Sequence, residues 1–452
     1  MRTAPPDLPG SQNNDSPIDR ALALLLADER ESALRWSAAV VDSDPSMPSA
    51  LILTCRLLAE AGRTEAAIEG LELAVKRSID TGNLPMAVAA VADLRKLGRP
   101  TDKYFDEIAK SFCCDSPRLT DAAPPPPPLP TFAQFEPLSS FLAGPALLSK
   151  ATAIVHEASE KLKRADGTLT PITPLPLFSA IEQEGLRALI GAFEMITVPA
   201  GNEVIVEGEE GAETYIVARG ELEVRRRGSD ENAVPVTLAR LVGGALFGEM
   251  ALLSRAPRAA SVFANRPSIL LVATREALEK VAETRPEVGV ELAAHCRRRM
   301  VANLVRTSRV LIDVNPTDRP ALVERFETRV FEKGEKLITE GDETRGLHLI
   351  ASGEVAVIGH ESGEPLVIST LAVGEVVGEV ALVLRRRASA DVVAIHPTVT
   401  LYLPREDFLA LIREYPAILQ SLYLSAILRD EETREVIGNV ATNVIAEDYD
   451  LV

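Results

Sequence analysis

The second half of the chain repeats its own pattern of glycines, and this duplication strongly constrains the fold. Three glycines recur at a constant displacement of 133 residues: Gly201, Gly208 and Gly220 return as Gly334, Gly341 and Gly353. A Gly-Glu pair at residues 248–249 returns at residues 378–379 after 130 residues. Between these glycines Val and Ile alternate with polar residues, which is typical of short strands joined by tight turns. The pattern predicts two copies of one β-rich domain.

Residues 18–112 have a different composition, rich in Ala and Leu at helical spacing. Three residues recur here after 36 positions: Leu58, Gly62 and Arg63 return as Leu94, Gly98 and Arg99. The segment 61–68 resembles the turn and second-helix start of a tetratricopeptide repeat, whose period is about 34 residues. We expect Gly62 to end a helix, because glycine adopts the left-handed cap conformation at little cost. The sequence predicts a tetratricopeptide-like helical domain over 18–116, with an ordinary helical bundle as the alternative.

A proline-rich segment follows, with eight prolines in residues 117–137, five of them consecutive. Proline lacks an amide donor and fixes φ, so we expect an extended spacer over 117–171. A docking site for a proline-recognising domain is the alternative. The predicted order is a disordered N-terminus (1–17), the helical domain (18–116), this linker (117–171), two β-rich domains (172–312 and 313–440) and an acidic tail (441–452). The predicted fold class is α+β, an N-terminal α-helical repeat module followed by two β-rolls with flanking helices.

The most specific motif lies between Phe247 and Ser261 and reads Phe-Gly-Glu-Met-Ala-Leu-Leu-Ser-Arg-Ala-Pro-Arg-Ala-Ala-Ser. This segment resembles the phosphate-binding cassette of the cyclic nucleotide-binding domain family. Together with the duplication, it resembles the tandem domains in regulatory subunits of cAMP-dependent protein kinase. The resemblance covers residues 175–437. It implies a ligand site in the first domain formed by seven residues: Gly248, Glu249, Met250, Ala251, Arg258, Ala259 and Ala260.

The chemistry of a cyclic nucleotide agrees with this resemblance. The ligand has one negative phosphate, and Arg258 offers a rigid fork of donors to two of its oxygens. Glu249 is an acceptor suited to the free ribose 2′-hydroxyl, and Gly248 lets the backbone approach the ligand closely. Family members that prefer cGMP often have Thr after the arginine, whereas this chain has Ala259. The resemblance therefore implies cAMP as the ligand, with cGMP less favoured.

The second copy departs from this pattern at the arginine. Aligned without a gap, Ala388 falls on the position of Arg258, and Arg387 lies one residue early; a one-residue deletion would restore Arg387 to the site. Asp391 replaces the serine, and its negative charge would disfavour a phosphate nearby. We expect this site to be empty or to bind cAMP at least about tenfold more weakly. The residues that correspond to a second ligand site are Gly378, Glu379, Ala381 and Arg387.

Several other functions are disfavoured. The net charge is −18, and the Arg-rich stretch 292–312 is interpreted as a solvated helical face, so we expect no nucleic-acid partner. The longest apolar run near the N-terminus falls far short of the about 20 residues that span a bilayer, and we expect no membrane partner. None of the four cysteines forms a CxxC pair, which favours the cytoplasm. The histidines lack metal-ligand spacing and no GxxxxGK[ST], HExxH or GxSxG motif occurs, so we expect no catalytic residues, metal or cofactor.

These features predict a non-enzymatic cAMP receptor that transmits ligand binding to an unidentified protein partner through residues 18–116. One alternative is a kinase regulatory subunit-like inhibitor. It would need an Arg-Arg-x-Ala/Ser segment before the first β-roll, and the nearest match, at residues 163–166, is poor. Another is a structural scaffold with vestigial ligand domains. A transcription factor resembling catabolite activator protein is disfavoured, because only 49 residues follow Leu403.

Overall fold

The computed structural model describes residues 16–120, 135–163, 170–227, 235–253, 255–308, 314–315, 322, 325–361 and 364–449. Residues 1–15 of the predicted disordered N-terminus and residues 121–134 of the proline-rich segment lie outside these ranges. The chain divides into two compact units. The first consists of the chain up to Ile205 together with Glu213–Phe247 and Ser261–Glu291; the second consists of Val206–Ala212, Gly248–Ala260 and the residues from Leu292 onward.

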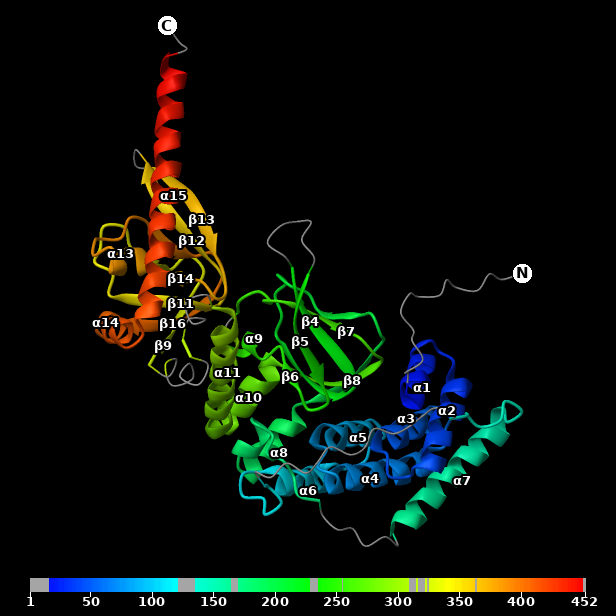
Figure 1. Ribbon diagram of the computed structural model, residues 1–452. Coiled ribbons are helices and arrows are strands. Elements are labelled where there is room, and N and C mark those ends of the chain that lie inside the picture. Colours follow the sequence, from blue (N-terminus) through cyan, green and yellow to red (C-terminus); the bar gives the residue numbers. More distant parts are fainter. Residues whose placement is uncertain are drawn as a thin grey trace. The chain divides into compact units, whose positions relative to one another are not determined.

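The first unit opens with consecutive helices (Figure 1). They are α1 (Pro17–Leu26), α2 (Arg30–Ser43), α3 (Pro48–Glu60), α4 (Thr64–Asp80), α5 (Leu84–Lys96) and α6 (Asp102–Phe112). Gly62 follows α3 with a φ of 79°, and Gly98 follows α5 with a φ of 74°. Only glycine adopts this left-handed conformation freely, so the expectation that Gly62 ends a helix is confirmed. The N-terminal region is helical, as predicted.

Helix α7 (Gly144–Lys163) corrects the expected extent of the linker. Apolar residues recur along it at helical spacing and are all buried: Leu147, Ala151, Ile154, Val155 and Ala158. Helix α7 packs against α2, α3 and α4. The prolines that forbid a helix end at Pro137, and the residues after them have an amphipathic pattern that forms a helix once a partner face is available.

The first roll forms two antiparallel sheets in the first unit. Its strands are β1 (Glu194–Val198), β2 (Glu203–Ile205), β3 (Glu213–Arg219), β4 (Glu221–Arg226), β5 (Val236–Val242), β6 (Leu246–Phe247), β7 (Ser261–Ala264) and β8 (Ser268–Thr274). They are ordered β1-β8-β3-β6 and β2-β7-β4-β5. The short helix η1 (Phe178–Ala180), α8 (Gln183–Gly191) and α10 (Arg275–Thr284) flank them. Val217, Leu222 and Leu270 are fully buried in the roll's core.

The second roll, in the second unit, has the same topology. Its strands are β9 (Glu327–Phe331), β10 (Lys336–Ile338), β11 (Gly346–Ser352), β12 (Val355–Glu361), β13 (Glu364–Leu371), β14 (Val376–Val377), β15 (Asp391–Ala394) and β16 (Thr398–Pro404). They are ordered β14-β11-β16-β9 and β10-β15-β12-β13. The associated helices are α9 (Met250–Leu253), α11 (Pro286–Thr307), α13 (Glu379–Val383), α14 (Arg405–Glu414) and α15 (Pro416–Tyr449). Helix α15 continues through residues 441–449 of the predicted acidic tail (Figure 1).

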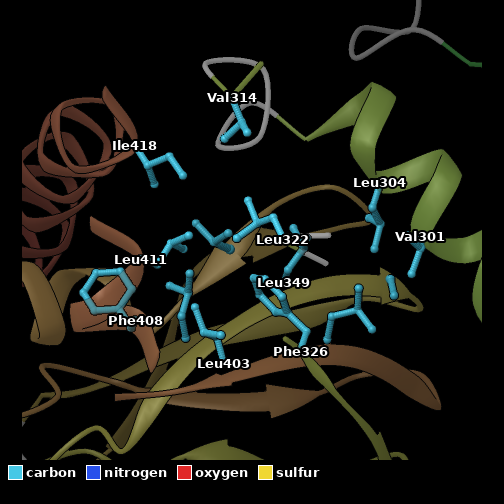
Figure 2. Packing of buried hydrophobic residues seen from close by; sticks show 14 of the residues in the cluster. Val301, Leu304, Val314, Leu322, Phe326, Leu349, Leu403, Phe408, Leu411 and Ile418 are labelled. Atoms are coloured by element: carbon cyan, nitrogen blue, oxygen red, sulfur yellow. The ribbon is translucent and has the colours of Figure 1, made fainter. Parts of the chain in front are cut away.

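A hydrophobic cluster holds the second unit together (Figure 2). It contains Leu349 and Leu403 from the strands, Phe408 and Leu411 from α14, Ile418 from α15, and Val301 and Leu304 from α11. Burying side chains of this size stabilises a fold by about 1.5–3 kcal/mol each. The cluster therefore packs the helices that precede and follow the second roll in sequence against its strands. Among the described helices, none combines the length and apolar character needed to cross a membrane.

The two rolls coincide residue by residue. Glu203 lies opposite Phe263 in the first roll, and the residues displaced by 133 and 130, Lys336 and Val393, lie opposite each other in the second. The three-residue difference falls between β4 and β5, where the first roll has the longer hairpin, as the sequence predicts. The predicted duplication of a β-rich domain is confirmed.

Candidate functional site

The first cassette begins where strand β6 ends. Gly248 follows Phe247 with a φ of 75°, and this left-handed turn leads through Glu249 into α9. Met250 begins α9 and packs, partly buried, against the hydrophobic cluster of the second unit. Ala251 lies in the same helical turn. The cassette thus connects a strand end to a helix end, a place where backbone amides are available to an anion.

Glu249 is buried, with 4% of its surface exposed, and its carboxylate is paired. Nε of Arg299, on α11, lies 3.2 Å from Oε1. The Sγ of Cys296, one turn earlier on α11, donates to the carbonyl oxygen of Glu249 at 3.4 Å. Burial raises the pKa of Cys296 to about 12, so its thiol keeps the proton that it donates. Helix α11 therefore contacts the residue expected to receive the ribose hydroxyl.

Arg258 is anchored by its backbone to the loop before β3. Its amide donates to the Glu209 carbonyl and its carbonyl accepts from the Gly208 amide, both at 2.9 Å. Its Nη1 donates to the Gly248 carbonyl at 3.0 Å, which brings the guanidinium back to the start of the cassette. Gly211 leaves room for it, because a Cβ at that position would lie 2.7 Å from Arg258 Cζ. The guanidinium of Arg258 therefore lies at the backbone of Gly248, the residue that precedes Glu249.

The two alanines after Arg258 differ in exposure. Ala259 is exposed and Ala260 is half-buried. Small side chains at these positions leave the backbone after Arg258 accessible to a ligand. All seven residues predicted for the first site lie in the segment Gly248–Ala260, which belongs to one compact unit.

The second cassette keeps its glutamate and pairs it in the same way. Gly378 has a φ of 89°, and Glu379, only 1% exposed, begins α13. Nη1 of Arg429, on α15, lies 2.6 Å from Glu379 Oε1, and its Nη2 lies 3.1 Å from Glu375 Oε1. Burial raises the pKa of the Glu379 carboxyl, although Arg429 opposes that change. A buried glutamate paired with an arginine is therefore present in both copies.

The arginine of the second cassette lies outside its site. The Gly341 amide donates to the Ala388 carbonyl and the Ala388 amide donates to the Asp342 carbonyl, both at 2.9 Å. These bonds match those of Arg258, so the backbone follows the gapless alignment and the alternative one-residue deletion is wrong. Arg387 is exposed and donates to the Gly341 carbonyl at 2.8 Å.

A cavity that is partly open to solvent lies at the second cassette. Ala381, Glu379 and Ala388 line it, and Arg387 does not. Nearby, Asp391 is 3% exposed and accepts hydrogen bonds from Lys336 Nζ at 2.6 Å and the Glu340 amide at 2.8 Å. Burial raises the pKa of Asp391, but these bonds outweigh it and hold the pKa below its usual range. The glutamate of the second cassette therefore lines a cavity that solvent can enter.

Sequence reasoning missed the two arginines that pair with the cassette glutamates. Arg299 was assigned only to a solvated basic helix, and Arg429 was not singled out. The signal was present, because the two arginines are displaced by 130 residues, as are Glu249 and Glu379. No group of three or more His, Cys, Asp or Glu side chains suited to a metal ion occurs in the described part of the chain.

Both rolls match one known domain family. The family model described as "Cyclic nucleotide-binding domain" matches residues 195–285 and 328–415. The chain carries two cyclic nucleotide-binding domains. It is similar to the cAMP-dependent protein kinase regulatory subunit of Yarrowia lipolytica, with 31% identity over 206 residues, 46% of this chain and 50% of that protein. The regulatory subunit of Hypocrea atroviridis is 33% identical over 225 residues, 48% of this chain and 46% of that protein.

A solved structure of the regulatory domain of Toxoplasma gondii PKA with cAMP aligns at 23% identity, covering 55% of this chain and 90% of that chain, with a TM-score of 0.27. The chain spans about half the length of the curated relatives that it matches. The two cyclic nucleotide-binding domains resemble those of the kinase regulatory subunits.

Proposed function

We propose that this protein is a non-enzymatic cAMP receptor whose first cassette binds the ligand. The observation that carries the proposal is that Gly248–Ala260 contains both a buried carboxylate and an arginine whose guanidinium returns to the start of the cassette. Glu249 suits the ribose 2′-hydroxyl, and Arg258 suits the cyclic phosphate. We expect the protein to have a regulatory role, as the names of its relatives suggest.

The mechanism follows from what these two residues contact. Arg299 on α11 holds the Glu249 carboxylate, and the Gly248 carbonyl accepts from Arg258. A bound nucleotide would give Glu249 a hydroxyl donor and Arg258 an anion, and both existing contacts would have to adjust. Ligand binding is thereby coupled to the position of α11. Such coupling requires that the ligand bind one arrangement more tightly than the other.

We further propose that the helical region over 18–116 is tetratricopeptide-like and passes the bound state to a protein partner. Supporting this, its helices contact the first roll within one compact unit. Arg95 of α5 donates to the carbonyls of Gly191 and Phe193, both at 3.2 Å. Asp19 of α1 pairs with Arg219 of β3. A change in the first roll therefore has a direct route to these helices.

We place this receptor in the cytoplasm. The four cysteines are all unpaired thiols in the structure, and such thiols persist in a reducing compartment. The proposal retains the domain order of the sequence analysis, with the first ligand domain over 172–312 and the second over 313–440.

Isothermal titration calorimetry of the full-length chain with cAMP and with cGMP tests this proposal. We expect cAMP to bind tightly and cGMP to bind more weakly. Absence of binding by either nucleotide would support the alternative of a scaffold with vestigial ligand domains.

The names of the relatives favour one second candidate, a kinase regulatory subunit-like inhibitor. Its candidate inhibitory segment, residues 163–166, lies outside the described residues after Lys163. Mixing the chain with a cAMP-dependent protein kinase catalytic subunit would decide between the two. Inhibition that cAMP relieves would establish the kinase role, and unchanged kinase activity would leave the receptor without it.

A further inference from the structure

The two cassettes differ at a pair of neighbouring positions, where the larger side chain lies at one position in the first cassette and at the other in the second. In the first, Gly211 leaves space that the guanidinium of Arg258 occupies. The residues at equivalent positions in the second are Thr344, displaced by 133, and Ala388, displaced by 130. The second cassette therefore has a hydroxyl, from Thr344, where the first has the guanidinium of Arg258.

Thr344 contributes a hydroxyl group to the lining of the cavity. It lines the cavity and is 7% exposed, and its Oγ1 has no hydrogen-bond partner in the described part of the chain. A buried hydroxyl without a partner costs free energy, so such groups are normally satisfied. Its methyl group fixes the side chain against the cassette, since a Cβ at Gly378 would lie 3.0 Å from Thr344 Cγ2. The hydroxyl is therefore held where a ligand can satisfy it.

The positive charges around this cavity already have anionic partners. Arg429 is the single cation among the described residues lining it, and it pairs with Glu379. Lys336 pairs with Asp391, whose carboxylate adds negative charge beside the cassette. A phosphate placed here would be desolvated without a dedicated cation, which is strongly unfavourable.

We propose that the second site binds an uncharged ribonucleoside in preference to a cyclic nucleotide. Glu379 accepts a hydrogen bond from a ribose hydroxyl, and the Thr344 hydroxyl bonds a second polar group of the ligand. The lining of the cavity is otherwise largely apolar, which suits the uncharged remainder of the ligand. The ribose contact rests on the role proposed for the cassette glutamate. The preference against phosphate rests on Ala388 at the position of the arginine and on the pairing of Arg429 and Lys336 with carboxylates.

The test uses the full-length chain carrying Arg258→Ala, so that the first site is weakened and heat reports the second. Adenosine, guanosine and cAMP are titrated by calorimetry. We expect at least one of the two nucleosides to bind at one molecule per chain, at least about tenfold more tightly than cAMP. Thr344→Val, which keeps the shape and removes the hydroxyl, should weaken nucleoside binding several-fold.

The reverse exchange provides the matched variant. Adding Thr344→Gly and Ala388→Arg to this background should recreate the first cassette and shift the preference to cAMP. Nucleoside binding no tighter than cAMP binding, or no binding of either nucleoside by a chain with an unchanged melting curve, would overturn the inference. The wild-type chain is titrated in parallel with cAMP. If the wild-type chain does not bind cAMP, the function proposed for the first site is wrong, whereas the ligand of the second site is decided by the nucleoside titrations.

Discussion

At the scale of single residues, the two cassettes differ in where each holds its positive charge. In the first, the guanidinium of Arg258 turns back to the Gly248 carbonyl, beside the buried Glu249. In the second, Arg387 turns outward to the Gly341 carbonyl, although it is displaced by only one position in sequence. Ala388 occupies the backbone position of Arg258, so a displacement of one residue is enough to take the guanidinium to another carbonyl.

Arg258→Ala and Glu249→Ala should each weaken cAMP binding to the full chain. A charge-assisted hydrogen bond contributes about 1.5–3 kcal/mol, so losing the arginine fork should cost about 100-fold or more in affinity. Arg255→Ala is the control, because this exposed arginine lies in the same cassette three residues earlier. Calorimetry measures all three. Unchanged affinity in both test variants would contradict the assignment of the first site.

Ala259→Thr should narrow the preference for cAMP over cGMP. Ala259 is exposed next to Arg258, so a threonine fits without repacking and adds a hydroxyl that can bond guanine. One hydrogen bond contributes about 0.5–1.5 kcal/mol, or roughly two- to tenfold in the affinity ratio. Competition between the two nucleotides measures this ratio. A wild-type chain that favours cGMP would refute the argument on base selectivity.

At the scale of elements, each roll is followed by a helix that carries an arginine to the cassette glutamate. Arg299 on α11 and Arg429 on α15 are equivalent residues of the duplication. In both copies the helix thereby neutralises a carboxylate that burial would otherwise disfavour. Each cassette is consequently joined to the following helix by an ion pair. A ligand that bonds to the glutamate would weaken this pair.

Strand β11 contains a histidine that should make the stability of the second roll pH-dependent. His348 is 4% exposed, its Nδ1 lies 3.0 Å from Thr400 Oγ1, and burial lowers its pKa from 6.5 to about 4. The unfolded chain takes up a proton below pH 6.5 that the folded chain refuses, so stability falls as the pH decreases towards about 4. This difference corresponds to about 3 kcal/mol.

Thermal or urea unfolding of wild type and His348→Gln between pH 7 and 4 measures this effect. The variant should lose less stability on acidification, since glutamine can keep a hydrogen bond to Thr400 without titrating. Parallel pH profiles for the two proteins would show that His348 is not the group responsible.

The duplicated strands were predictable because their determinants are local. Gly201, Gly208 and Gly220 mark turns that any copy of the roll requires, and they recur at one spacing. Helix α7 could not be predicted in this way, because it follows a proline run and because the helix faces that it packs against, on α2 and α4, are far away in sequence. The Gly211–Arg258 contact was missed for the same reason: 47 positions separate residues that meet only in the folded chain.

At the scale of the whole molecule, the helical region and the first roll share charged contacts inside one compact unit. Asp19 on α1 is 3% exposed and pairs with both Arg219 and Arg266, the latter at 3.3 Å. Arg219 also donates to Ser16 Oγ at 2.8 Å. One buried carboxylate thus joins the first helix to two places in the roll.

Asp19→Ala should weaken this connection by about 1–3 kcal/mol, because it removes the acceptor of two charged hydrogen bonds. Hydrogen exchange of α1 amides should become faster. Asp42→Ala, at an exposed position of α2, is the matched control and should leave this exchange unchanged. Unaltered exchange in Asp19→Ala would show that other contacts hold α1 in place.

The whole chain should bind one cAMP tightly, although it has two homologous domains. Both cassettes retain the glutamate, but only the first has a guanidinium in register, and the second has Ala388 at that position and Asp391 nearby. Equilibrium dialysis of the full chain should count about one tight cAMP, which Arg258→Ala removes. Arg387→Ala should leave the count unchanged, because Arg387 is not among the residues that line the cavity and donates to the Gly341 carbonyl. Two tight sites, one of them lost with Arg387→Ala, would mean that ligand binding draws this arginine into the second cassette, and the division of labour between the domains would then have to be abandoned.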